Sequence, residues 1–438
     1  MPVMLFAEIF RPDHTDTGND RCTNTPSDNL TGMPHATASS TATSMSPGLI
    51  VLLLSLLLGL QPITTDLYLP ALPVITGSFG APMVQAQLTL TALLLAFGLS
   101  QLVWGPLSDR YGRRPVLLLG LSAYVLAAIG STLAPSMVAL IVWRAVQGAA
   151  MGAAVMCARA IVRDLYAPLQ GAKVMSQGLT GLGVIAFLSA PTGGLLTDLS
   201  NWRIALLALA VFGAVCLGLI AWRFEETLAH KNPNALQAAT LLATWKSILR
   251  HPTFLAFSAL SAASYGGLFT FLAASSFVFM NVLTLSKTQY GALMALNSLA
   301  YIGGTFLCRY WLPRFGVRRS LKWAGVLSLS GGTLMALPSL MGVQSVWAIM
   351  SAQLLFIIGH GIHQPCGQSG AVGPFPHAAG AASALNGFLM MLAAFAMGSW
   401  LGSHMDGTVL PLTLGVWFWS ALIALTAWTL VQTHGEPK

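Results

Sequence analysis

Residues 105–114 read Gly-Pro-Leu-Ser-Asp-Arg-Tyr-Gly-Arg-Arg, the densest group of charges in the first half of a chain in which charge is scarce. The segment lies between two long apolar runs, Val84 to Trp104 and Pro115 to Ala134. Arginine and aspartate side chains are costly to place in lipid. We therefore predict that residues 105–114 form a short turn between two membrane-spanning helices.

The composition indicates an integral membrane protein. Of 438 residues, 55% are apolar and only 8% are charged, with a mean hydropathy of +0.71, which leaves too little polar surface for a soluble globule of this size. The net charge of +8 does not indicate nucleic-acid binding, because the basic residues fall in short segments between apolar runs. No CxxC pair occurs, so we interpret the cysteines as free, apolar-packed thiols, namely Cys22, Cys157, Cys216, Cys308 and Cys366.

Apolar runs long enough to cross a hydrocarbon core of about 30 Å follow one another almost without pause from Gly48 onward. They predict an all-α membrane protein of twelve spans. The predicted spans are residues 48–69, 84–106, 115–134, 137–162, 171–197, 202–224, 253–280, 288–311, 320–340, 345–369, 378–402 and 410–432.

The only long internal break between apolar runs divides the spans into six and six. We predict a cytoplasmic linker over residues 225–252, between one six-helix half at 48–224 and another at 253–432. Two such halves with a cavity between them at mid-membrane are the arrangement expected of a secondary transporter.

The second half repeats the charged segment of the first. Arg314-Phe-Gly-Val-Arg-Arg319 follows the eighth predicted span much as Arg110-Tyr-Gly-Arg-Arg114 follows the second. Pro313 stands where Asp109 would repeat, so the second copy lacks the acid. The similarity favours two six-helix pseudo-repeats.

The ends of the chain and its orientation follow from composition. Residues 1–47 are rich in Thr, Ser, Asp, Asn and Pro and predict a disordered cytoplasmic tail, with Met33 or Met45 as an alternative start. Residues 433–438 predict a short second tail. Lys and Arg concentrate in alternate loops, which places both termini in the cytoplasm.

Ionisable residues inside the spans are few, and each is a functional hypothesis. Asp66 is the only acid in an apolar run that is not clearly at an end, and Pro62, Pro70 and Pro73 are expected to break the helix beside it. Counting to Pro70 places Asp66 about 6 Å below the outer end of the first span. The alternative is that Asp66 simply lies at the outer membrane surface.

Arg144 enters the fourth span from the outer side to a depth of about 10 Å. Because this depth is comparable with that of Asp66, we expect the two side chains to face the cavity and interact, directly or through water. Gln147 is one turn deeper than Arg144 and is expected to share that face. A cavity-facing carboxylate beside a cation is what proton coupling needs.

His360 and His363 lie three residues apart, and Cys366 follows after three more. This spacing is conceivable for a metal site. Polar lining of a cavity, together with Gln364 and Gln368, is the interpretation that we favour, so we predict no metal and no cofactor. No GxxxxGK[ST] loop occurs in the chain, so nucleotide hydrolysis has no support.

These segments resemble the major facilitator superfamily, and within it the twelve-span drug:proton antiporters of the Bcr/CflA multidrug resistance group. Residues 105–114 look like the signature loop between spans two and three, with matching positions at Gly105, Asp109, Arg110, Gly112, Arg113 and Arg114. Arg144-Ala-Val-Gln-Gly148 is similar to the arginine motif of span four, and Asp66 to Pro73 resembles the end of span one. The resemblance covers about residues 48–432.

Two segments depart from the group. The Gly-Pro motif of span five appears as Ala190-Pro-Thr-Gly-Gly194, which weakens the antiport assignment. His363 and Gln364 stand where relatives tend to carry apolar residues, which suggests a substrate more polar than a typical lipophilic drug.

The resemblance implies a monomeric bacterial inner-membrane exporter of drugs or drug-like molecules, driven by protons and working by alternating access, which would confer antibiotic resistance. Asp66 would accept the proton with Arg144 as its partner, and Asp109 would latch the inner gate against the start of span eleven near residues 376–380. Alternatives are a metabolite exporter or proton symporter of the same fold and, from another class, a membrane enzyme or receptor. The side chains expected to line the substrate cavity are Tyr68, Gln147, Asn297, Tyr301, His363, Gln364 and Asn386.

Overall fold

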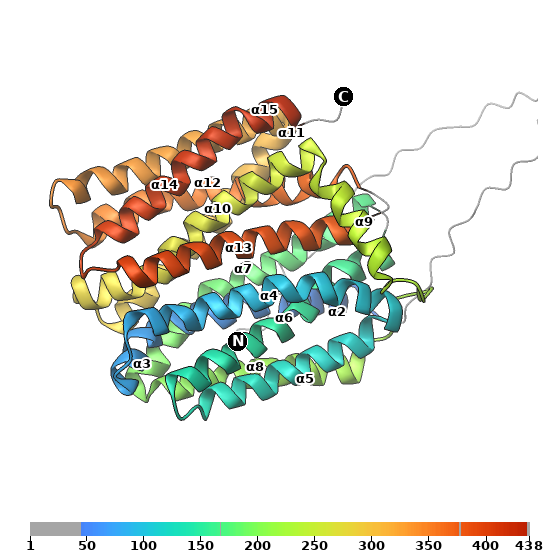
Figure 1. Ribbon diagram of the computed structural model, residues 1–438, viewed down its shortest axis with the longest axis horizontal. Coiled ribbons are helices and arrows are strands. Elements are labelled where there is room, and N and C mark those ends of the chain that lie inside the picture. Colours follow the sequence, from blue (N-terminus) through green and yellow to red (C-terminus); the bar gives the residue numbers. More distant parts are fainter. Residues whose placement is uncertain (1–44, 167, 376–377, 436–438) are drawn as a thin grey trace, which may run out of the picture. The chain divides into compact units, whose positions relative to one another are not determined.

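The computed structural model describes residues 45–435 apart from residues 167 and 376–377, and every regular element within this part of the chain is a helix (Figure 1). The predictions for the terminal tails therefore fall almost wholly outside the described residues. The first six-helix half contains α2 (Pro47–Asp66), η1 (Leu69–Ala71), α3 (Leu72–Phe79), α4 (Met83–Tyr111), α5 (Arg113–Thr132), α6 (Met137–Leu165), α7 (Pro168–Leu199) and α8 (Trp202–Arg223). Next come α9 (Ala238–Leu249), α10 (Pro252–Phe277), η2 (Val278–Val282), α11 (Lys287–Leu340), α12 (Val346–Val372), α13 (Ala379–His404), α14 (Leu410–Trp428) and α15 (Leu430–His434).

The membrane-spanning helices agree with the twelve predicted spans once α11 is divided. Eleven helices in the described residues are long and apolar enough to cross a membrane, and α11 alone has 54 residues. Gly316, with φ 70° and ψ 173°, interrupts its helical geometry. The parts of α11 on either side of Gly316 are the eighth and ninth spans, which confirms the predicted all-α fold.

The predicted connection between two membrane helices does lie within residues 105–114, but it is one residue long instead of spanning the whole segment. Helix α4 continues through this charged segment to Tyr111, and α5 begins at Arg113. Gly112, with φ 109° and ψ 163°, is the single non-helical residue between them. The polar side chains need to leave the apolar layer, but the backbone does not need to unwind, because a helix satisfies its own hydrogen bonds.

The first span is longer than predicted. The expected break of the α-helix beside Asp66 is present: α2 ends at Asp66, Leu67 and Tyr68 form a turn, and η1 and α3 follow with Pro70 and Pro73 in their first turns. Pro62 lies inside α2 without ending it. The span nevertheless continues through η1 and α3 to Phe79, so Asp66 lies about 20 Å from that end, counted at helical rise, instead of about 6 Å. The placement of Asp66 near the outer surface is therefore wrong.

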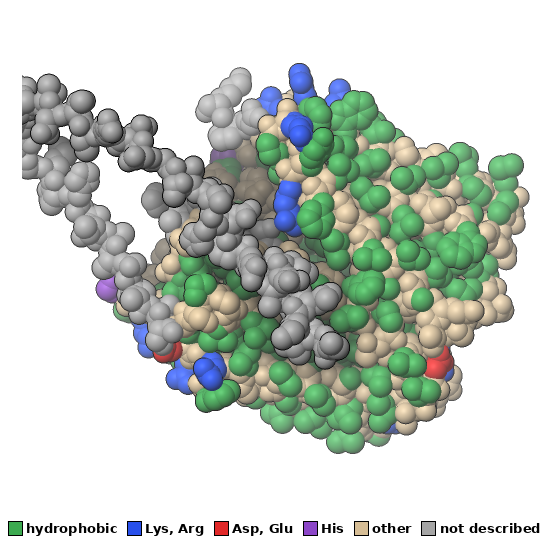
Figure 2. Space-filling model, turned by 180° about the vertical axis from the view of Figure 1, so that it is seen from behind, with side chains coloured by type: hydrophobic (Ala, Val, Ile, Leu, Met, Phe, Trp, Pro, Cys, Tyr) green, Lys and Arg blue, Asp and Glu red, His purple; other side chains and the backbone are tan. Residues whose placement is uncertain are grey.

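The two halves meet along two helix pairs. Helix α4 packs against α13, and α7 packs against α11. Large apolar side chains remain exposed on the outward faces, among them Leu119, Leu126 and Val138, each more than 60% exposed. Figure 2 shows apolar side chains over most of the visible face, with Lys and Arg gathered at its top and lower left. Such a surface requires lipid around it.

Candidate functional site

A central cavity of about 400 Å³ lies between the two halves. Its wall is formed by α2, α4, α6 and α7 of the first half and by α10, α11, α12 and α13 of the second. No described residue of α5, α8 or α14 lines it. The volume is that of a site for a drug-sized molecule.

Four of the side chains expected to line the cavity are on its wall, namely Asn297, Tyr301, Gln364 and Asn386. Tyr68, Gln147 and His363 are not, and their placement on the wall is corrected here. All three are fully buried in helix packing: Tyr68 donates to Thr89 Oγ1 on α4, Gln147 accepts from Arg144 on its own helix, and His363 Nε2 lies 3.2 Å from Ser328 on α11. The sequence analysis missed several wall residues, which share only the property of being polar within an apolar run: Gln61, Gln101, Arg159 and Tyr265.

Asp66 is the only acid among the described residues that line the cavity. Its carboxylate accepts a hydrogen bond from Thr65 Oγ1 at 2.9 Å, and the side chain is half-buried. Gln61, one turn earlier on α2, donates to the hydroxyl of Tyr265 on α10 at 2.9 Å. The acid therefore sits beside a polar contact that joins the two halves.

Arg144 does not pair with Asp66. Its guanidinium donates to Gln147 Oε1 at 2.8 Å and to the carbonyl of Thr64 at 3.0 Å, and it lies 4.3 Å from the ring centre of Tyr68. No ion pair joins Arg144 and Asp66 within the described part of the chain, and the expected direct interaction is wrong. Arg144 is fully buried among helices and fixes the backbone two residues before Asp66.

His360 and His363 point to different helices. His360 lines the cavity, and its Nδ1 lies 2.8 Å from Ser264 Oγ on α10. His363 Nε2 lies 3.2 Å from Ser328 Oγ on α11, away from the wall. No group of three metal-ligating side chains occurs among the described residues. Cys366 instead approaches Cys308, with 3.7 Å between the sulfur atoms, a proximity that the sequence spacing did not indicate.

One end of the bundle is closed by contacts between α7 and α11. Asp198 forms an ion pair with Lys287 at 3.2 Å and accepts the backbone N–H of Thr288 at 3.0 Å. A Cβ atom at Gly194 would collide with the carbonyl of Lys287, so glycine permits this close approach. The segment Ala190–Gly194, whose sequence departs from the pattern of the group, therefore forms part of the contact between the halves.

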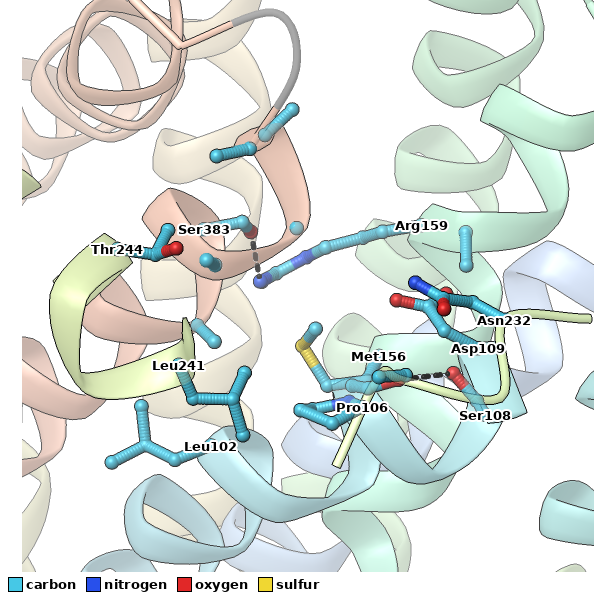
Figure 3. Close-up of a pocket in the computed structure, with 18 of the residues that line it drawn as sticks. Leu102, Pro106, Ser108, Asp109, Met156, Arg159, Asn232, Leu241, Thr244 and Ser383 are labelled. Atoms are coloured by element: carbon cyan, nitrogen blue, oxygen red, sulfur yellow. Dashed lines mark hydrogen bonds between the residues drawn. The ribbon is translucent and has the colours of Figure 1, made fainter. Parts of the chain in front are cut away.

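The opposite end holds a vestibule of about 700 Å³ between α4, α6, α9 and α13 (Figure 3). Arg159, Val372 and Ser383 line both the vestibule and the central cavity. Helix α9, which lies within the predicted linker, contributes Leu241 and Thr244 to the wall. The cavity is therefore bounded by packed helices at one end and by a hollow at the other.

The predicted gating segment forms a charged cluster beside the vestibule. Arg113 is 1% exposed and donates to Asp109 at 2.7 Å and to Asp164 on α6 at 2.8 Å. Arg163 lies 3.9 Å from Asp109, and the N–H of Asn232 donates to the Asp109 carbonyl at 2.9 Å. The cluster joins α4, α5, α6 and the linker of the first half.

The other residues of the predicted gating segment lie around this cluster. Gly105 lines the vestibule, Gly112 forms the connection, Arg110 lies 5.5 Å from the ring centre of Tyr111, and Arg114 donates to the carbonyl of Ala221 at 2.9 Å. The expected partners of Asp109 include residues 376–377, which lie outside the described residues. No ion pair between Asp109 and α13 occurs in the part of α13 that the structure describes.

Helices of two halves around one central cavity are the geometry of a membrane transporter, and the sequence matches the Major Facilitator Superfamily over residues 54–399. The chain belongs to this superfamily. It is a transporter and not an enzyme, and its substrates are small molecules. The helices and the superfamily together make it a multi-pass membrane protein.

Named relatives and a solved structure agree with this assignment. The chain is 32% identical to "Multidrug resistance protein D" of Escherichia coli K12, over 78% of this chain and 85% of that protein. It is 31% identical to the "Chloramphenicol resistance protein" of Pseudomonas aeruginosa, over 76% and 79% of the two chains. The fold matches the xylose transporter XylE of E. coli in a partially occluded inward-open conformation, with a TM-score of 0.70, 14% identity and coverage of 88% and 97%. The predicted Bcr/CflA-type assignment within the major facilitators is confirmed.

Proposed function

We propose that this protein exports small drug-like molecules across the bacterial inner membrane in exchange for protons. The names of the relatives support drug export, and the central cavity has a volume suited to one such molecule. In alternating access the two halves, residues 48–224 and 253–432, rock about this cavity while the linker over residues 225–252 joins them. One chain contains both halves, so a monomer suffices.

The observation that carries proton coupling is Asp66, the single acid on the described cavity wall. An ionisable side chain at membrane depth is costly and is retained where it serves transport. In a cavity that opens alternately to two sides, this carboxylate binds a proton from one side and releases it to the other. Arg144 acts as a positioning residue, because it holds the Thr64 carbonyl next to the acid-bearing turn.

The charge distribution supports an orientation with both termini in the cytoplasm. The cluster around Arg113 and the linker helix α9 lie at the vestibule end, where the positive excess of the short loops also falls. The vestibule then faces the cytoplasm, and the contact between Asp198 and Lys287 closes the outer end. This arrangement matches a state ready to receive substrate from inside.

The test uses everted membrane vesicles whose lumen is acidified by respiration, with chloramphenicol as the first probe. An antiporter carries the probe into the lumen and protons out, so adding chloramphenicol should raise the luminal pH and restore the fluorescence of a quenched acridine dye. Asp66→Asn should abolish this response because the amide binds no proton.

Asp406→Asn is the matched control. Asp406 is exposed between α13 and α14, and the hydroxyl of Thr408 donates to it at 2.7 Å, which holds the pKa of Asp406 below its ordinary value. The group is thus ionised at neutral pH, and its replacement removes a charge without touching the cavity. An undiminished response in Asp66→Asn would refute the assignment. A response only in vesicles loaded with chloramphenicol beforehand would indicate symport.

A further inference from the structure

Arg159 occupies the junction between the central cavity and the vestibule. It lies fifteen residues after Arg144 on α6, about 22 Å along the helix, and therefore far from Asp66. Figure 3 shows its side chain extending across the hollow toward α13, where Nη1 donates to Ser383 Oγ at 3.0 Å. A molecule passing between vestibule and cavity meets this guanidinium.

The charge of Arg159 is not neutralised by the protein. Arg113 binds Asp109 and Asp164, whereas no carboxylate among the described residues lies within 4.0 Å of the Arg159 nitrogens. The hydroxyl of Ser383 is its one hydrogen-bond acceptor in that part of the chain. A guanidinium carries five N–H donors in a planar fork that matches the two oxygens of a carboxylate. Arg159 therefore presents unused donors at a passage for solutes.

Two buried amides lie beside this position. Gln101 and Asn386 are 1% and 2% exposed, both line the cavity, and Gln101 Oε1 and Asn386 Oδ1 have no hydrogen-bond partner among the described residues. Asn386 follows Ser383 by three residues on α13, and the neighbouring Gly387 packs directly against Gln101. Buried amides without partners are costly in apolar surroundings. The unpartnered atoms are oxygens, so they are satisfied when a ligand with N–H or O–H groups enters.

We propose that Arg159 binds the carboxylate or similar oxyanion of transported molecules, while the amide oxygens of Gln101 and Asn386 accept hydrogen bonds from N–H or O–H groups of the same molecules. The substrates would then include small organic acids or zwitterions with an apolar body, which extends from Arg159 into the cavity. This inference rests on the proposed transport function and specifies its substrate class. Because Asp66 lies far along the bundle, the anion and the proton occupy separate sites.

The contact with Ser383 offers a competing role for Arg159. The hydrogen bond joins α6 of the first half to α13 of the second, and in the competing role it serves only to hold the halves together. In that case Ser383→Ala would disturb transport of every substrate as much as a change of Arg159. If Arg159 instead recognises the substrate, Ser383→Ala leaves the charge of Arg159 in place and changes the binding of acidic molecules little.

Binding to the purified full-length protein in detergent tests the site without any proton gradient. The probes are dansylglycine, its methyl ester and N-dansylethylenediamine, which carry a negative, neutral and positive end on the same fluorescent body. Dansylglycine should bind most tightly to the wild type. Arg159→Gln should weaken its binding about tenfold to a hundredfold, since a hydrogen-bonded charge pair is lost, and leave binding of the ester unchanged. Arg159→Lys should recover part of the affinity.

The measurement separates this site from proton coupling. Asp66→Asn should retain the preference for dansylglycine even though it loses proton exchange in vesicles. Unchanged binding of the ester to Arg159→Gln also shows that this variant is folded. Equal binding of the three probes to the wild type, equal loss of acid and ester in Arg159→Gln, or the same loss in Ser383→Ala would overturn the proposal.

Discussion

Each half has an arginine-rich connection between two spans, around Gly112 in the first half and around Gly316 in the second. Among the described residues, only in the first connection do arginines form ion pairs with acidic side chains. In the first half, Arg113 lies between Asp109 and Asp164 with nitrogen–oxygen distances of 2.7 and 2.8 Å. In the second half, Arg314 lies 3.5 Å from the ring centre of Tyr310, and no described acid pairs with any arginine of the connection. The same backbone connection thus exists with and without an ionic network.

The glycines show that the backbones correspond. Gly112 and Gly316 both have positive φ, 109° and 70°, with ψ of 163° and 173°. Arginines alone are sufficient to orient a loop in the membrane. The acids near the first connection must therefore have a role other than setting orientation. In the structure they join the connection to α6 and to the linker.

Arg113→Met should have the largest effect on stability. It leaves Asp164, whose side chain is 11% exposed, without its cation, and breaking a buried pair costs about 3–5 kcal/mol. The thermal unfolding midpoint of the detergent-purified protein should fall by several degrees. Arg319→Gln, an exposed change in the second connection, should stay within about 0.5 kcal/mol of the wild type. Equal midpoints for both variants would remove the contrast between the halves.

Gly112→Ala should have the next largest effect and should exceed Gly316→Ala. Both changes place a side chain at a backbone conformation that costs about 1–3 kcal/mol. A Cβ atom at residue 112 would also collide with the carboxylate of Glu226, whereas nothing lies within 4 Å of one at residue 316. That carboxylate accepts the backbone N–H groups of Arg113 and Arg114 at 2.8 and 3.1 Å. Chemical denaturation of the two variants side by side measures the difference.

Sequence reasoning predicted the spans because twenty apolar residues in a row leave little alternative to a membrane helix. It located the connection within residues 105–114 but made it too long, because charge was taken as a signal for a turn, whereas only Gly112 leaves the helical conformation. It likewise ended the first span at Pro70, although a proline in the first turn of a helix is compatible with continuation.

The cavity was harder to predict than the fold, since the facing of a polar side chain depends on the packing of distant helices. Asn297 and Tyr301 lie on the wall, while His363, three residues from the wall residue His360, points to α11. Arg159 was overlooked because lysines and arginines near the ends of the spans were interpreted only as signals of topology. Nothing in a single sequence distinguishes an arginine that orients a loop from one that lines a passage.

Asp109→Asn should have the smallest effect on stability and still impair transport. The side chain of Asp109 is 43% exposed, so its pair with Arg113 contributes only about 0.2–1 kcal/mol. The amide keeps the size and one acceptor of the carboxylate. If Asp109 meets the positive N-terminal end of the eleventh span when the vestibule closes, the lost charge destabilises only that outward-facing state.

Chloramphenicol-driven proton exchange in everted vesicles measures this effect, with membrane abundance measured in parallel and Asp406→Asn as the control. A several-fold loss of exchange at normal abundance and an almost unchanged unfolding midpoint would support the latch. Full activity of Asp109→Asn would show that the first connection has only a structural role, in the cluster around Arg113. A fall in midpoint as large as that of Arg113→Met would show that the carboxylate acts within the cluster alone, because a latch formed in another conformation contributes nothing to the unfolding of this one.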